Sequence, residues 1–274
     1  MPAKRIVYLN GKFIAADNKT ALVRDPAFLA GPGVFETMRS YRGRIVYLDE
    51  HLRRLKRSSA LAGLKLNYTA AKLKAVIGKA VSLNKLRDAC VRVTVWRSAH
   101  GMGILAAAEK YEPHTDQKYK AGFSAYISSV RQNDPSSALI KSVNRILYDM
   151  ALKEARIKGC DEAVLVNSKG ELAEGSRSNI FLVKDGQVFT PLLECGCLDG
   201  ITRRAVLALA KKKKIKVHEA RLLPRDLLSA DEAFLTNSLM GIMPLTFLER
   251  TAIGKRGSPV TALLVKEYNI LSRK

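Results

Sequence analysis

Strand-like and helix-like segments alternate along both halves of this 274-residue chain. In some segments apolar residues recur at every second position, as in a half-buried strand. In others they recur at every third or fourth position, as in an amphipathic helix. Apolar residues make up 47% of the chain, so each half can bury a core. This mixture predicts an α/β (or α+β) enzyme rather than a repeat or coiled-coil protein.

The expected elements follow from this periodicity and from turn and cap signals. We expect strands at 6–9, 12–15, 34–41, 44–47, 89–96, 122–130, 162–166, 179–184, 187–190 and 233–236. We expect helices at 49–62, 69–83, 143–158, 202–212 and 259–271. Asn10-Gly11 is a strong hairpin turn signal, and Asp49 is the expected N-cap of its helix. No period holds between His100 and Tyr119.

These elements predict two domains. We expect an N-terminal α/β domain over residues 1–118, an interdomain strand and loop over 119–136, and a C-terminal domain over 137–274.

The chain is strongly basic, with 47 lysines and arginines against 25 acidic residues and a net charge of +22. A non-catalytic nucleic-acid-binding protein is one interpretation of this charge. The basic residues are spread along the whole chain, however. The one dense run, Lys211–Lys214, falls where a helix is expected to end, and cations there complement the helix dipole. No zinc-finger spacing or aromatic-basic interleaving accompanies them. Attraction of anionic small molecules is a sufficient reason for the charge.

No segment approaches the about 20 apolar residues that span a bilayer, and no apolar signal core follows the N-terminus. We therefore expect a cytoplasmic enzyme without a membrane partner. The cysteines have no partners at zinc-ligand spacing, so we expect no metal site and interpret them as structural thiols. They are Cys90, Cys160, Cys195 and Cys197.

Two titratable residues stand in informative surroundings. Lys141 lies between an apolar stretch and an expected helix. A lysine held among apolar side chains has a lowered pKa and can form a Schiff base, although an isolated lysine is more often a surface charge. Glu174 begins the run Glu-Gly-Ser-Arg-Ser-Asn between two expected strands. It could be a turn residue, or it could be aimed into a cleft where it keeps a ring nitrogen protonated.

Three further segments are candidate anion sites. Gly200–Arg203 combines a glycine with the start of a helix, where unpaired amides and the helix dipole attract a phosphate. It could also be an ordinary helix start capped by Thr202. The donor-rich loop 236–241 could contact a phosphate or a carboxylate, or be only a polar loop. Arg54 could clamp a phosphate from its helix, or be a surface arginine.

Together these motifs match one family in order and spacing. The series is Gly-Val-Phe-Glu-Thr (33–37), His-x-x-Arg-Leu (51–55), Lys141, Glu-Gly-x-x-Ser-Asn (174–179), Asp-Gly-Ile-Thr-Arg (199–203) and Thr-Asn-Ser-x-Met-Gly (236–241). It resembles the class IV pyridoxal-phosphate-dependent aminotransferases, which include branched-chain aminotransferases, D-amino-acid aminotransferases and aminodeoxychorismate lyases. The resemblance implies a small N-terminal α/β domain, a larger C-terminal pseudo-barrel domain and a homodimer.

The resemblance also implies residue roles. Lys141 would carry pyridoxal 5'-phosphate as a Schiff base and move a proton at the substrate α-carbon, and Glu174 would pair with the pyridine nitrogen. The residues expected to hold the cofactor phosphate are Arg54, Ile201, Thr202 and Ser238. The residues expected to contact substrate are Phe35, Glu36, Arg39, Arg92 and Leu239. The substrate pocket would also include Phe28, the strand 92–96 and the loop 100–108.

The reaction itself is left open by two departures from the family pattern. Branched-chain aminotransferases usually have a tyrosine five residues after the lysine, where this chain has Ile146. They also have one two residues before the carboxylate-binding arginine, where it has Cys90. The run 141–144 looks closer to the D-amino-acid enzymes, and the Asn144-Arg145 pair resembles the lyases. We expect a transaminase acting on a branched-chain or D-amino acid and a 2-oxo acid. The alternative is a 4-amino-4-deoxychorismate lyase, which releases pyruvate and forms 4-aminobenzoate.

Overall fold

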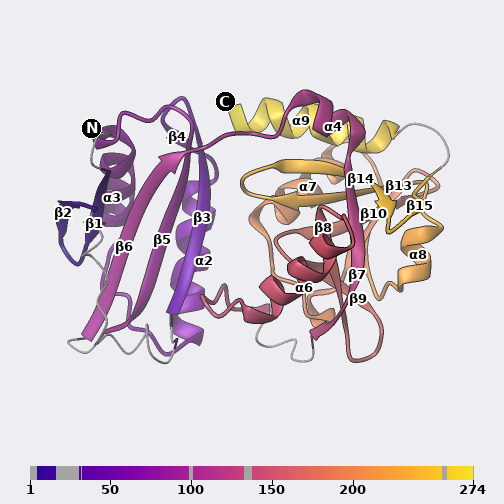
Figure 1. Cartoon of the computed structure of the whole chain (residues 1–274). Helices are drawn as coiled ribbons and strands as arrows, with labels where there is room; N and C mark the ends of the chain where they lie inside the picture. The colour runs from indigo at the N-terminus through magenta and orange to yellow at the C-terminus, as the bar shows by residue number, and fades with distance from the viewer. Residues whose placement is uncertain are drawn as a thin grey trace. The chain divides into compact units, whose positions relative to one another are not determined.

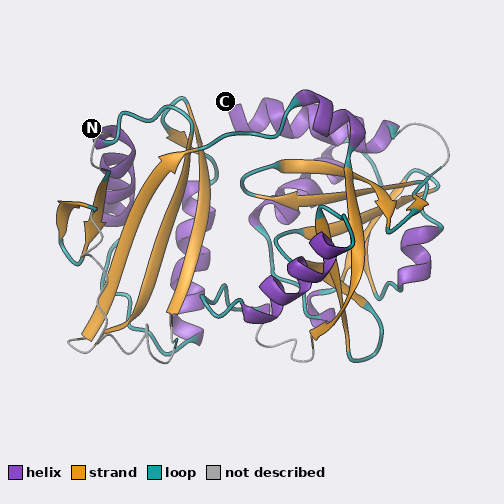
Figure 2. Cartoon of the chain, in the orientation of Figure 1, coloured by secondary structure: helices purple, strands orange, loops and turns teal. Residues whose placement is uncertain are grey.

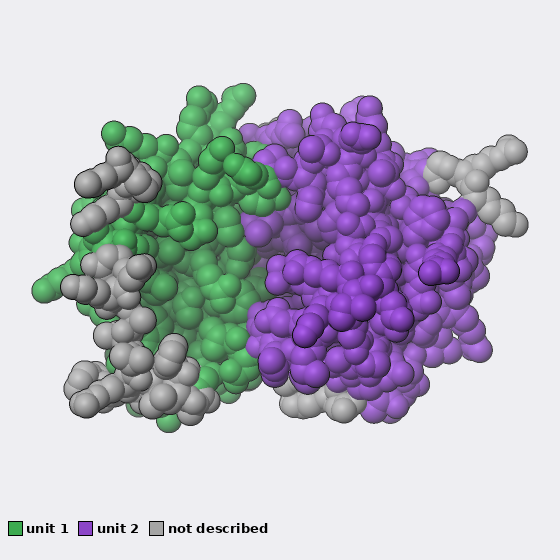
Figure 3. Space-filling model, in the orientation of Figure 1, with its two compact units in different colours: residues 1–112, 140–144 green, residues 113–139, 145–274 purple. Residues whose placement is uncertain are grey.

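A computed structural model describes residues 5–16, 31, 33–98, 101–132, 138–254 and 258–273. The chain divides into two compact units, coloured separately in Figure 3. Unit 1 comprises residues 1–112 and 140–144, and unit 2 comprises residues 113–139 and 145–274. The predicted division differs from this one in giving 113–118 to the N-terminal domain and 140–144 to the C-terminal one. The segment 140–144 belongs to unit 1 because it hydrogen-bonds to a strand more than 100 residues earlier, as the bridge between Val34 and Ser142 shows.

Unit 1 is an antiparallel sheet with two helices on one face (Figures 1 and 2). Its strand order is β2-β1-β6-β5-β3-β4. The strands are β1 (Ile6–Leu9), β2 (Lys12–Ala15), β3 (Gly33–Tyr41), β4 (Arg44–Ile45), β5 (Ala89–Ser98) and β6 (Gly101–Lys110). The helices are α2 (Leu48–Leu61) and α3 (Ala70–Leu83). Apolar side chains of both helices and of the helix-facing side of the sheet form the core.

The two faces of this sheet have different compositions. Val34 on β3 and Val93 on β5 are buried in the helix-facing core. Successive side chains of a strand point to opposite faces, so Phe35, Arg39 and Arg92 lie on the other face. That face is where several of the predicted substrate residues gather.

Unit 2 is built on a nine-stranded mixed sheet with the order β12-β11-β10-β13-β14-β7-β8-β9, and β15 pairs with β14. The strands are β7 (Phe123–Gln132), β8 (Glu162–Asn167), β9 (Leu172–Gly175), β10 (Asn179–Lys184), β11 (Gln187–Pro191), β12 (Val217–Ala220), β13 (Glu232–Asn237), β14 (Gly241–Leu248) and β15 (Thr251–Ala252). The helices are α4 (Asp116–Ala121), α6 (Ile146–Ile157), α7 (Ile201–Lys212), α8 (Pro224–Leu228) and α9 (Pro259–Arg273), with a 3-10 turn at Leu193–Cys195. Strand β9 contacts β10 and β11 as well as its partner β8, so the sheet curls back on itself. Helices packed on sheets in both units confirm the predicted α/β class.

Several local predictions are confirmed. Asn10 and Gly11 have the positive φ values of 45° and 103° that a tight hairpin turn between β1 and β2 needs. The helix expected at 69–83 is α3, and the Thr69 side chain caps it by accepting a hydrogen bond from the Lys72 amide at 3.2 Å. The final turn of α7 carries Lys211 and Lys212, as expected at a helix C-terminus.

Three local predictions are wrong. The stretch expected to be irregular contains β6 and α4, because pairing with both β1 and β5 holds the alanine-rich segment of β6 extended. Helix α2 begins one residue before Asp49, with Tyr47 as its N-cap, so Asp49 does not cap it. Helix α6 begins at Ile146 rather than 143, because residues 141–143 are bonded to β3. Within the described ranges, no helix has the length and hydrophobicity to cross a membrane.

Candidate active site

Lys141 is fixed beside the start of β3 in unit 1. Its carbonyl accepts a hydrogen bond from the Phe35 amide at 2.9 Å, and its own amide donates to Ser58 Oγ at 3.3 Å. Its half-buried side chain places Nζ 4.8 Å from the centroid of the Phe35 ring. The backbone is thus held from two sides while the amine rests over an aromatic face, which restricts where a nucleophilic nitrogen can reach.

A buried cluster of three charged or titratable side chains lies between β3 and α2. Glu36 accepts hydrogen bonds from Arg54 Nε and Nη2, each at 2.8 Å, and its Oε2 is 2.7 Å from His51 Nδ1. The exposed fractions are 0% for Glu36, 3% for Arg54 and 1% for His51. Burial alone raises the pKa of Glu36, but Arg54 and His51 outweigh it and lower the pKa to about 2. The guanidinium of Arg54 is therefore held in one orientation by a charged, bidentate partner.

His51 completes this cluster as a neutral ring. Burial lowers its pKa below the usual 6.5, against the opposing effect of Glu36. A neutral imidazole has one N–H, and Nδ1–H is the group that can donate to the carboxylate. The spacing of His51 and Arg54 in the His-x-x-Arg motif therefore puts two donors on one face of α2, both directed at Glu36.

The predicted substrate contact of Glu36 is not supported by this geometry. Its side chain points toward α2, on the face of the sheet opposite to Phe35 and Arg39, and both of its oxygens are engaged. Glu36 instead orients Arg54. The motif at 51–55 contains His51, but its sequence alone does not indicate a role for this residue.

Three other predicted substrate residues do lie on one face of the unit 1 sheet. The Arg92 guanidinium stacks on the Phe35 ring at 4.0 Å, and that of Arg39 lies over Tyr41 at 4.0 Å and Tyr111 at 4.4 Å. Such stacking fixes the planar groups without neutralising their charge. This face therefore combines aromatic surface with two positive charges, a combination suited to an organic carboxylate.

Glu174 is a buried carboxylate of unit 2 with several hydrogen-bond donors. It lies near the end of β9 with 5% of its surface exposed. Its carboxylate accepts hydrogen bonds from Tyr148 Oη at 2.9 Å, the Leu198 amide at 2.9 Å and Asn179 Nδ2 at 3.4 Å. Three donors around a buried carboxylate favour its ionised form. Asn179 belongs to the motif at 174–179. Tyr148 and Leu198 lie outside the motifs and are brought to Glu174 by the fold.

The Glu-Gly-x-x-Ser-Asn motif has a physical explanation in the loop after β9. A Cβ on Gly175 would lie 2.2 Å from Ser178 Oγ, so only glycine allows the close approach. Ser178 Oγ donates to buried Glu162 at 2.9 Å, and Ser176 donates to the same carboxylate. Burial raises the pKa of Glu162, and the serine hydrogen bonds oppose that rise. The side chain of a second carboxylate, Glu162, therefore holds this loop in place through hydrogen bonds. No sequence motif indicated Glu162.

The start of α7 keeps the character of an anion site. Gly200 is its N-cap, and no side chain among the described residues caps this end. A Cβ on Gly200 would lie 2.0 Å from Asn179 Oδ1, so glycine is needed to bring the turn against β10. Thr202 lies inside the helix rather than capping it, and its hydroxyl is 3.5 Å from Tyr268 Oη. The amides of Ile201 and Thr202 thus belong to a helix N-terminus with the polarity that attracts a phosphate.

The second candidate anion loop is shaped by Asn237. Its Oδ1 accepts hydrogen bonds from the amides of Leu239 at 3.0 Å and Met240 at 2.9 Å, and its Nδ2 donates to the Arg177 carbonyl at 3.1 Å. The Leu239 amide is thereby directed at Asn237, and the substrate contact expected of Leu239 stays a prediction. Ser238 lies half-exposed at the tip of this turn.

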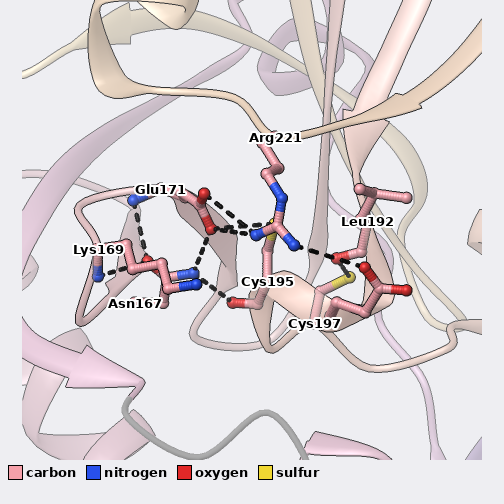
Figure 4. Close-up of polar contacts among 8 residues, drawn as sticks. Asn167, Lys169, Glu171, Leu192, Cys195, Cys197 and Arg221 are labelled. Atoms are coloured by element: carbon pink, nitrogen blue, oxygen red, sulfur yellow. Dashed lines mark hydrogen bonds and ion pairs between the residues drawn. The ribbon is translucent and has the colours of Figure 1, made fainter.

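A polar cluster anchors the segment that leads to Leu198 (Figure 4). Arg221 Nη1 donates to both oxygens of Glu171, at 3.2 and 3.0 Å. Asn167 Nδ2 donates to Glu171 Oε2 at 2.8 Å and to the Cys195 carbonyl at 3.4 Å. Buried Cys195 and Cys197 are free thiols with hydrogen-bond acceptors nearby. Among the described residues, no group of histidine, cysteine and acidic side chains is arranged to hold a metal ion.

Comparison with known proteins identifies the family. The family profile for class IV amino-transferases matches residues 33–247. The chain belongs to the class IV aminotransferases. A putative branched-chain-amino-acid aminotransferase of Methanocaldococcus jannaschii is 33% identical over 98% of this chain and 96% of its own. An aminodeoxychorismate lyase of Bacillus subtilis is 32% identical over 96% and 93%. A D-alanine aminotransferase of Listeria monocytogenes is 32% identical over 94% and 93%.

Solved structures of class IV aminotransferases confirm the predicted two-domain fold. The branched-chain aminotransferase from Thermoproteus uzoniensis with norvaline superposes with a TM-score of 0.90 at 30% identity, covering 99% of this chain and 96% of that one. The branched-chain amino acid aminotransferase of Escherichia coli has a TM-score of 0.92 at 25% identity, covering 98% and 95%. Relatives with three different activities have similar identities to this chain, so family membership alone does not select the reaction.

The structure places the two residues at which this class IV aminotransferase departs from the branched-chain pattern. Ile146, which replaces a tyrosine of that pattern, is 69% exposed. Cys90 lies opposite Arg39 on the sheet face that carries Arg92. Phe28 and His100, expected in the substrate pocket, lie outside the described residues, and the rest of the expected loop 101–108 is part of β6.

Proposed function

We propose that this class IV aminotransferase binds pyridoxal 5'-phosphate through Lys141 and transfers an amino group between an amino acid and a 2-oxo acid, as a homodimer. The observation that carries the proposal is the placement of Lys141. Its backbone is pinned to β3 and α2, and its amine rests on the Phe35 ring. A surface lysine that served only for charge would not need two backbone anchors and an aromatic support.

The remaining residues fit the chemistry of this cofactor. In the described part of the chain no side chain caps the helix N-terminus at Ile201 and Thr202, which suits a phosphate. Ser238 and Arg54 are proposed to bind the same group. Arg54 enters this role with its orientation already set by Glu36. Glu174, buried and surrounded by donors, suits a protonated ring nitrogen.

Pyridoxal phosphate supplies an electron sink that stabilises negative charge at the substrate α-carbon. Lys141 would hold the cofactor through Nζ and would move the proton at that carbon. Glu174 would keep the ring nitrogen protonated. Arg92 and Arg39 attract the carboxylates of amino and oxo acids, and Phe35 limits the space beside them.

A lyase is the second candidate. The Bacillus subtilis aminodeoxychorismate lyase is about as similar as the transaminases, and the Asn144-Arg145 pair follows Lys141 in this chain. Arg145 stacks over Tyr148 at 4.2 Å and donates to the Ser176 carbonyl. A lyase uses the same lysine and the same ring-nitrogen carboxylate, and differs in expelling pyruvate from 4-amino-4-deoxychorismate.

Absorption spectroscopy tests the proposal. The protein is reconstituted with pyridoxal phosphate, and L-leucine, L-glutamate and D-alanine are added one at a time. A visible band that one amino acid bleaches supports a transaminase and gives its stereochemistry. A stable band together with pyruvate release from 4-amino-4-deoxychorismate supports the lyase.

Replacing Lys141 by alanine is expected to abolish both the visible band and turnover while the far-ultraviolet circular dichroism stays unchanged. Lys153→Ala is the matched control, because Lys153 is an exposed lysine on α6. Near-normal turnover in Lys141→Ala would end the assignment.

A further inference from the structure

The carboxylate of Glu174 receives a hydrogen bond from a tyrosine that lies outside every motif of the family resemblance. Tyr148 lies in the first turn of α6, and its hydroxyl is 2.9 Å from Glu174 Oε1. Gln132 Nε2, at the end of β7, donates to the same hydroxyl oxygen at 3.1 Å. A phenol has one proton, and the Gln132 amide occupies a lone pair of its oxygen. The Tyr148 proton is therefore directed at Glu174.

The Tyr148 ring is held so that this direction is kept. The Arg145 guanidinium stacks on one face at 4.2 Å from the centroid and donates to the Ser176 carbonyl, in the loop that follows Glu174. The ring also packs against the buried cluster that includes Ala151 and Ala155 of α6, as Tyr126 does. Burial, and then the charge of Glu174, raise the pKa of Tyr148, so it stays a donor at ordinary pH.

We propose that Tyr148 is a positioning residue that lowers the proton affinity of Glu174, and so keeps the shared proton on the ring nitrogen of pyridoxal phosphate. This inference rests on the proposed function. A donor to a carboxylate withdraws negative charge from it and favours its ionised form. Without the hydroxyl, Glu174 still accepts from Leu198 and Asn179 but loses one charge-withdrawing donor, so it binds a proton more tightly.

The test compares two ligands in the full chain. Tyr148→Phe removes only the hydroxyl. Pyridoxal phosphate and its 1-deaza analogue, which has C–H in place of the ring nitrogen, are titrated by absorption into wild type and variant. We expect pyridoxal phosphate to bind about tenfold more weakly to the variant, the usual effect of one hydrogen bond to a charged group. We expect the analogue to bind both proteins alike, because it has no ring proton to share.

Two further variants separate positioning from structure. Tyr126→Phe is the matched control, since Tyr126 packs against the same buried cluster, and it should leave the affinities for both ligands unchanged. In a Glu174→Gln background, Tyr148→Phe should produce no further selective loss, because the two residues act as a unit.

If Tyr148→Phe weakens the binding of both ligands equally, or weakens the binding of neither, the inference is overturned and Tyr148 has only a packing role. Failure of wild type to bind either ligand would instead overturn the proposed function, and the inference with it. The two failures are distinguishable because the second is seen before any variant is made.

Discussion

Replacing Glu36 by glutamine tests the buried ion pair of unit 1. The substitution keeps the size of the side chain but removes the charge that Arg54 contacts through two hydrogen bonds of 2.8 Å. Arg54 is only 3% exposed, so water cannot replace the lost partner. We expect the free energy of unfolding to fall by about 3–5 kcal/mol, as when one partner of a buried pair is removed.

The pKa of Glu36 gives a second route to this magnitude. Folding lowers that pKa from 4.5 to about 2. At about 1.4 kcal/mol per pH unit, the difference corresponds to about 3 kcal/mol of stability at neutral pH. Both routes therefore predict destabilisation when the charge of Glu36 is removed.

The assay is urea unfolding followed by the fluorescence of Trp96. Trp96 is the single tryptophan of the sequence and lies on β5, so its signal reports unit 1. With a denaturant dependence of about 2 kcal/mol per molar, the expected fall in the urea midpoint is about 2 M. This readout needs neither cofactor nor substrate.

Glu50→Gln is the matched control on the same helix. Glu50 pairs with Arg53 at 3.0 Å, but the two side chains are 37% and 69% exposed. Such a surface pair contributes less than about 1 kcal/mol. If Glu36→Gln lowers the midpoint no more than Glu50→Gln does, the argument from the buried pair is refuted.

Two other predictions concern acid and the loop after β9. Because folding lowers the pKa of Glu36, its contribution to the free energy of unfolding is present above pH about 4.5 and is lost as the pH falls toward about 2. The urea midpoint reported by Trp96 should therefore fall more steeply over that range in wild type than in Glu36→Gln. Parallel pH profiles of the two proteins would contradict this. Gly175→Ala should destabilise the protein by about 1–3 kcal/mol, because the new Cβ would lie 2.2 Å from Ser178 Oγ. Gly78→Ala, in the middle of α3 with nothing within 4 Å, should instead stabilise by about 0.5–1 kcal/mol; thermal melts that move both variants in the same direction would contradict the packing argument.

The sequence by itself determined the features that depend on neighbouring residues. The Asn10-Gly11 hairpin and the helix that Thr69 begins were predictable, because a turn or a helix start is completed within a few residues. Hydrophobic periodicity identified most helices and strands for the same reason. The family motifs are local as well, and the profile match over residues 33–247 confirms the family that they indicated.

Tertiary structure decided every feature that joins distant parts of the chain. Strand β6 has alanines and glycines with weak strand preference, and it is a strand because β1 and β5 pair with it on both sides. Lys141 belongs to unit 1 because its segment bonds to β3, far away in the sequence. No local pattern could reveal this affiliation.

The same limit applies to the chemistry of the site. Sequence predicted that Glu36 contacts substrate, but strand alternation points it at α2, where Arg54 and His51 engage it. No sequence motif marked Tyr148 as a site residue, since its hydrogen-bond partner Glu174 lies 26 residues away on another element. A motif specifies which residue types are present. Which atoms face one another is set by the pairing of strands and the packing of helices, and these are fixed only when the whole unit folds.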